Sequence, residues 1–162
     1  MGSKELFHRL AIKDLCLGEQ ISRATAAEFN TTHPGVDTAG YESTMFILTM
    51  SDIDNVVNYV FTLLESDTST TTVGSSVAIT ECDAYCIKGL TGTDTTGLAK
   101  IDVATAGKPL TCTDATDEGC VFVWVYRGSK RYAWLHATVG SVAFTPRVLV
   151  IQSNSRRQPF IA

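Results

Sequence analysis

The sequence predicts an all-β protein, an antiparallel β-sandwich or jelly-roll-like single domain with an N-terminal arm and a long loop-rich insertion. Several segments are rich in β-branched and aromatic residues, large side chains alternate along them, and turn residues separate them. No segment shows a sustained helical period. With 162 residues, of which 44% are hydrophobic and 19% charged, the chain is long enough for one domain with a real core.

The strongest strand signal lies between residues 120 and 139. It predicts a β-hairpin that turns on Gly128-Ser129, because a two-residue primed turn favours glycine first. Alternation along both arms gives two faces. The face predicted to pack inward carries Phe122, Trp124, Tyr126, Ala133, Leu135 and Ala137, and the opposite face carries Val121, Val123, Val125, Tyr132, Trp134 and His136.

Other strands are predicted at residues 41–50, 56–64 and 143–152, with shorter ones at 73–79 and 100–103. In the second of these, Val57, Tyr59, Phe61 and Leu63 share one face. Pro146 suggests that the last strand begins at a sheet edge, because proline cannot donate to a ladder.

The predicted organisation is a leader over residues 1–35, a domain over 36–152 and a C-terminal tail over 153–162. For residues 3–17 a short helix and an extended arm both fit the pattern. Residues 80–119, rich in Thr, Asp and Gly, are predicted to be a loop-rich insertion that is functional or peripheral rather than core.

Charge and length exclude several classes of function. The net charge is −4 and the pI is about 5.3, so the composition gives no reason to expect nucleic-acid binding, which needs a clustered basic face. No apolar run has the length of a membrane span, and charges interrupt the N-terminus where a secretory signal needs an apolar stretch. We therefore expect a protein made in a cytoplasm, without a membrane or nucleic-acid partner.

No catalytic, cofactor or metal motif is present. The three histidines lie in different contexts, and no H-E-x-x-H, G-x-S-x-G or P-loop spacing occurs. The five cysteines match no zinc pattern, and reduced structural thiols are favoured, although disulfides Cys82–Cys86 or Cys112–Cys120 stay open for an oxidising medium. The sequence therefore predicts a protein that is not an enzyme and holds no cofactor or metal.

Candidate contact residues fall into three groups. The row Tyr132, Trp134 and His136 suits a contact with another layer or another chain, and an exposed pair of its rings also suits sugar stacking. Basic groups near the predicted turn and in the tail suit an acidic partner. The full set of candidate interface residues is Tyr132, Trp134, His136, Arg127, Lys130, Arg131, Arg156, Arg157 and Phe160.

Three short motifs carry a resemblance. They are Gly40-Tyr-Glu-Ser43, the stretch Phe61-Thr-Leu-Leu-Glu-Ser-Asp67, and Val125-Tyr-Arg-Gly-Ser-Lys-Arg-Tyr132. Their order resembles a group of small auxiliary head proteins of tailed bacteriophages, usually encoded beside the major capsid protein. The insertion at 80–119, and Trp134 at a position where a basic residue is expected, depart from that pattern.

The resemblance implies a virion structural protein, a decoration or cement protein on the capsid surface that stabilises the icosahedral head by bridging subunits of an HK97-type shell. Its implied partners are the major capsid protein and itself, as a homo-oligomer with a trimer as one option. Two alternatives stay open, a neck or tail-completion protein and a glycan-binding adhesion module displayed on the virion.

Overall fold

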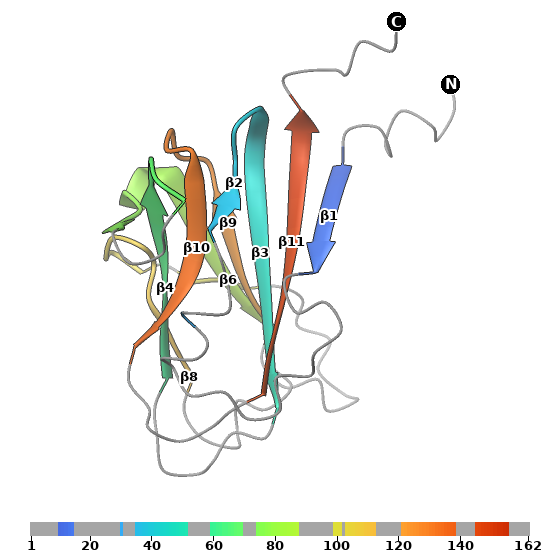
Figure 1. Ribbon diagram of the computed structural model, residues 1–162. Helices are drawn as coiled ribbons and strands as arrows, with labels where there is room; N and C mark the ends of the chain where they lie inside the picture. Colours follow the sequence, from blue (N-terminus) through green and yellow to red (C-terminus); the bar gives the residue numbers. More distant parts are fainter. Residues whose placement is uncertain are drawn as a thin grey trace, which may run out of the picture.

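The computed structural model is a sandwich of two antiparallel sheets (Figure 1). It describes residues 10–14, 30, 35–51, 59–69, 74–87, 99–101, 103–112, 121–138 and 145–155. Nearly all regular structure in these ranges is strand. The predicted all-β sandwich is therefore confirmed.

One sheet has six strands, and its order is β1 (Leu10–Asp14), β11 (Thr145–Ser155), β3 (Tyr41–Ser51), β9 (Val121–Tyr126), β6 (Cys82–Ile87) and β7 (Ala99–Ile101). The other has five, ordered β2 (Val36–Asp37), β10 (Tyr132–Thr138), β4 (Tyr59–Ser66) and β5 (Ser75–Ser76), with β8 (Leu110–Cys112) also on β4. A 3₁₀ turn, η1 (Ile79–Glu81), precedes β6. The two longest strands, β3 and β11, pair along their whole length.

The core lies between the sheets and follows the period of two that the sequence predicts. Tyr59, Phe61 and Leu63 of β4 are at most 1% exposed, and the intervening residues are half-buried. The predicted inner residues of 120–139 all belong to this core. Trp124 is fully buried, and its indole Nε1 donates to the Lys108 carbonyl at 2.9 Å, which satisfies the one polar atom of that side chain.

The predicted hairpin is wrong. β9 pairs with β3 and β6, whereas β10 pairs with β4 and β2, so the two arms lie in different sheets and residues 127–131 cross between them. Gly128 does not take the positive φ that a primed turn requires; among the described glycines only Gly40 and Gly107 do. Gly128 is needed for space instead, because a Cβ there would overlap the Tyr126 ring beneath it.

Residues 80–119 are more than a loop-rich insertion. β6 is an interior strand of the six-stranded sheet, and Cys82, Ala84, Cys86 and Leu110 from this region are core residues. Small inward side chains gave β6 a weak strand signal, which is why the sequence suggested a peripheral segment. The predicted strands at 73–79 and 100–103 correspond in part to β5 and β7.

Two described strands lie partly or wholly outside the predicted domain range of 36–152. The leader contributes β1, so at least residues 10–14 are extended, and β11 continues to Ser155 into the predicted tail. Pro146 lies in β11 beyond the end of β1, and among the described strands only β3 pairs with it, in agreement with the predicted edge position. Arg156, Arg157 and Phe160 lie outside the described residues.

Candidate interaction surfaces

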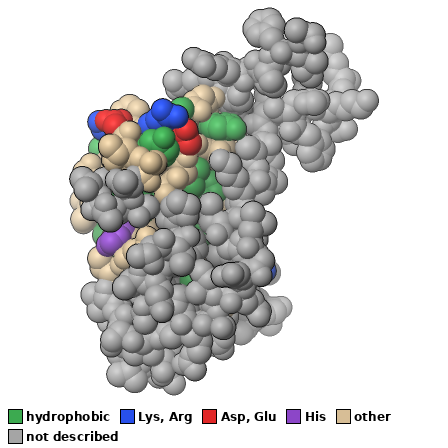
Figure 2. Space-filling model, viewed as in Figure 1, with side chains coloured by type: hydrophobic (Ala, Val, Ile, Leu, Met, Phe, Trp, Pro, Cys, Tyr) green, Lys and Arg blue, Asp and Glu red, His purple; other side chains and the backbone are tan. Residues whose placement is uncertain are grey.

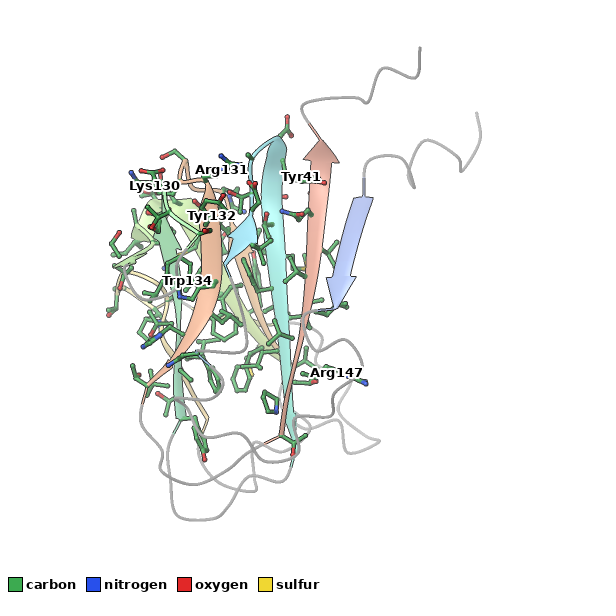
Figure 3. All side chains as sticks on the ribbon, viewed as in Figure 1. Tyr41, Lys130, Arg131, Tyr132, Trp134 and Arg147 are labelled. Atoms are coloured by element: carbon green, nitrogen blue, oxygen red, sulfur yellow. The ribbon has the colours of Figure 1, made fainter. Side chains whose placement is uncertain are left out.

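The three sequence motifs meet at one end of the sandwich, although they are far apart in the chain. Lys130 and Arg131, in the crossing between β9 and β10, lie at the same end as Tyr41 at the start of β3 (Figure 3). Thr38 joins them, because its Oγ1 donates to the carbonyl oxygens of Lys130 and Arg131 at 2.8 and 2.9 Å and its own carbonyl accepts from Tyr41 N at 3.1 Å. The motifs therefore form one structural corner.

Two hydrogen-bonded side chains, Tyr126 and Glu65, are buried beneath this corner. The Tyr126 hydroxyl donates to Glu65 Oε2 at 2.9 Å and accepts from Lys130 N at 3.1 Å. Glu65 is only 8% exposed, and burial raises the pKa of its carboxyl above 4.5. Burial, with the neighbouring Glu65 second, raises the pKa of the Tyr126 phenol, so the phenol stays protonated and serves as a donor.

Charged side chains surround the corner and form what we call the charged rim, visible as adjoining blue and red atoms in Figure 2. Its pairs are Arg131 with Asp37 at 3.1 Å, Lys130 with Asp67 at 2.6 Å, Lys100 with Asp83 at 2.6 Å, and Arg127 with Asp83. Hydrogen bonds from the cations lower the pKa of Asp67 and of Asp83.

The pairing changes how the predicted contact residues Arg127, Lys130 and Arg131 are interpreted. Each is exposed, but each has a carboxylate partner in its own chain. The rim is therefore a mosaic of both signs rather than a free basic patch, and it offers an acidic partner no unpaired cation among these three. Exposed pairs of this kind add little stability individually.

The row Tyr132, Trp134 and His136 lies on the outer face of the five-stranded sheet, but it is not an exposed aromatic surface. Trp134 is 1% exposed, and a Cβ added at Gly74 would overlap its ring. Gly35 also approaches this ring, and a Cβ there would lie 3.5 Å from it. The chain's own connections therefore cover Trp134, and the expectation that it contacts another chain or stacks on a sugar is wrong for this fold.

The neighbours of Trp134 keep some exposure. Tyr132 is half-buried with the Arg131 guanidinium 5.3 Å from its ring centroid, and His136 is also half-buried. Burial lowers the pKa of His136. Within the described part of the chain, neither Trp134 Nε1 nor His136 Nδ1 has a hydrogen-bond partner.

A second apolar surface among the described residues is the outer face of the six-stranded sheet, on the side away from the core. Register aligns its residues in rows, with Leu149, Ile47, Val123 and Tyr85 side by side. A neighbouring row aligns Ile151, Met45 and Val125. We define the apolar face as Met45, Ile47, Tyr85, Val121, Val123, Val125, Leu149 and Ile151, all of them half-buried except Val123, which is buried.

No third layer of described elements covers the apolar face (Figure 1). The nearly continuous apolar runs of β3, β9 and β11 indicate that both faces of this sheet are apolar. In a strand with only one buried face, apolar residues alternate with polar ones. The alternation along residues 120–139 placed the valines of β9 on one face, but it could not show that they adjoin β3, β6 and β11.

The described residues offer little for covalent or metal chemistry. No group of three or more His, Cys, Asp or Glu side chains within them is placed to hold a metal ion. Cys82 and Cys86 lie four residues apart along β6, a separation of about 13 Å, which is too far for a disulfide between them. The other suggested disulfide, Cys112–Cys120, involves a residue outside the described ranges.

Across the described ranges, no helix combines the length and apolarity needed to cross a bilayer. Comparison with protein-family models, with curated proteins and with solved structures gives no match.

Proposed function

We propose that this chain is a bacteriophage virion structural protein, a decoration or cement protein that binds the outside of an HK97-type head and bridges its major capsid protein subunits. The apolar face carries the assembly part of the proposal, because its residues are mostly half-buried rather than enclosed in the core, and a contiguous apolar patch that keeps solvent contact is typical of a protein-binding surface. The phage part is supported by the resemblance of the three motifs, which the fold brings into one corner.

The size of the apolar face favours a protein that binds in many copies. Four strands spaced about 4.8 Å apart, with about three residues each on average at about 3.3 Å per residue, cover about 200 Å². A stable pairwise interface buries about 800 Å² per partner. Contact through this face alone is therefore weak for one copy, and a repetitive shell compensates because neighbouring contacts add through multivalency.

The alternatives have less support. A glycan-binding module would need an open aromatic surface, and Trp134 is buried beneath the chain's own connections. No observation favours a neck or tail-completion protein, and copy number separates it from a decoration protein. A decoration protein covers the shell in many copies, whereas a neck protein forms a single ring.

The test uses purified heads that lack the protein, with recombinant chain added back. Ile47→Lys places a charge in the centre of the apolar face, and we expect at least a tenfold loss of apparent affinity, because a buried unpaired charge opposes docking. Thr111→Lys, an exposed position on β8 of the other sheet, is the matched control and should bind normally.

Both variants must first show the thermal unfolding of the parent, so that loss of binding is not loss of folding. Equal head occupancy of Ile47→Lys and the parent chain would contradict the docking face. Failure of the parent chain to bind heads at all would contradict the proposed function.

A further inference from the structure

β1 is a five-residue edge strand of the six-stranded sheet. It lies at the end of this sheet, and among the described strands it pairs with β11 alone, from Leu10 opposite Ser153 to Asp14 opposite Leu149. In Figure 1 it is the outermost strand, beside β11 alone. β1 can therefore detach from the sheet when only the hydrogen bonds of this five-residue pairing with β11 are broken.

The next described residue after β1 is Asn30, which contacts the other sheet. The Asn30 side chain pairs with the backbone of Ala137 in β10, where Nδ2 donates to the carbonyl at 2.9 Å and Oδ1 accepts from the amide at 2.8 Å. Residues 15–29 separate β1 from this anchor. Fifteen residues span at most about 50 Å, so a strand tethered at Asn30 can reach a neighbouring molecule as well as its own β11.

The edge of β11 needs a partner strand. Pro146 lacks an N–H and protects the first part of this edge, but the stretch Leu149–Ser153 depends on β1 for cover. Without β1 it would be an open edge that borders the apolar face, the kind of edge that recruits a strand from another chain.

From these observations we propose that the edge of β11 accepts residues 10–14 of a second copy, so that neighbouring molecules exchange β1. After exchange, β1 of one chain pairs with β11 of another through the same hydrogen bonds that join them in the monomer. Protein concentration therefore decides whether the closed monomer or the exchanged form predominates. Covalent connection through these fifteen residues gives the monomer's own strand an effective concentration of about 1 mM, so dilute protein stays closed and crowded copies exchange. The proposal does not require a phage shell.

Cysteine cross-linking at the observed register tests the exchange. Ile12 lies opposite Ile151, a spacing that suits a disulfide between directly paired strand residues. Chains with only Ile12→Cys are mixed with chains with only Ile151→Cys, unfolded together, refolded at several concentrations and oxidised. The matched control replaces Ile151→Cys with Arg147→Cys, an exposed position in the same strand about 13 Å further along.

We expect a disulfide-linked dimer from the 12/151 mixture on a non-reducing gel, rising more than tenfold between about 10 μM and about 1 mM protein, as the effective concentration requires. The 12/147 mixture and the parent chain, which carries the native cysteines, set the background. The double variant Ile12→Cys/Ile151→Cys should give an intrachain bond in dilute protein.

Two results would overturn the proposal. One is an intrachain bond in the double variant with no dimer above background from the mixture at any concentration, which would show that β1 never leaves its own chain. The other is absence of the intrachain bond, which would show that residues 10–14 do not occupy this edge. Neither result bears on head binding, so failure here is distinguishable from failure of the proposed function.

Discussion

Replacing Tyr126 by Phe removes one hydroxyl from the corner where the motifs meet. In the folded protein this hydroxyl donates to Glu65 and accepts from Lys130 N. The ring itself, which is 2% exposed, stays in the core. The substitution therefore leaves a nearly buried carboxylate without its donor and a backbone amide without its acceptor, and it creates only a very small cavity.

The size of the effect follows from these two lost contacts. A hydrogen bond to a charged group contributes about 1.5–3 kcal/mol and an ordinary one about 1 kcal/mol, and the slight exposure of Glu65 lets water replace part of the loss. We expect Tyr126→Phe to lower the free energy of unfolding by about 2–3 kcal/mol, and hence the Tm by about 5–10 °C for a chain of this length. Tyr85→Phe, at a half-buried position on the apolar face, is the control, with an expected change below about 0.5 kcal/mol.

The effect should depend on pH in a defined direction. Folding raises the pKa of Glu65 through burial, and the Tyr126 hydrogen bond partly offsets that rise. The folded state therefore binds the Glu65 proton more tightly than the unfolded state does. The contribution of Glu65 to the free energy of unfolding falls as the pH rises through its raised pKa in the folded state. Without the hydroxyl the pKa rises further, so the penalty of Tyr126→Phe should be larger at pH 8 than at pH 5.

Urea unfolding at the two pH values measures both quantities, and the same measurement on Glu65→Gln shows whether the pH dependence belongs to this carboxyl. In the Glu65→Gln background the penalty of Tyr126→Phe should no longer vary with pH. A penalty no larger than that of Tyr85→Phe, or one larger at pH 5 than at pH 8, would refute the reasoning.

Two further predictions concern residues around the same sheets. Trp134→Ala should lower the free energy of unfolding by about 3–5 kcal/mol in chemical denaturation, because it empties a buried site under Gly74 and Gly35, and a near-neutral change would show that the ring is exposed. Hydrogen bonds from Lys100 and Arg127 lower the pKa of Asp83 in the folded state. Ionised Asp83 therefore stabilises the fold above the usual aspartate pKa of about 4, and this stabilisation is lost as the pH falls through the lowered pKa. The Tm difference between the parent and Asp83→Asn should therefore shrink on acidification in thermal scans, and a constant difference would contradict the assignment.

Local sequence determined which side of each strand is buried. Side chains alternate with a period of two whatever the strand pairs with, so the inner placement of Phe122, Trp124 and Leu135 was predicted correctly from a hairpin that does not exist. The same alternation placed Tyr59 and Phe61 on one face, which the structure shows to be the core side, and with the turn residues between strands it predicted the fold class.

Only the tertiary structure decided which strands are neighbours. A glycine in a short polar connection fits a tight hairpin and a crossing between sheets equally well. The strand pairing shows that residues 127–131 form a crossing, and the Tyr126 ring beneath Gly128 explains why a glycine is needed there. Pairing is a long-range choice, set by how all strands bury their faces together rather than by any one segment. For the same reason the sequence placed Trp134 on the outer face but could not show that connections carrying Gly35 and Gly74 cover it, nor that β3, β6, β9 and β11 join into one apolar face.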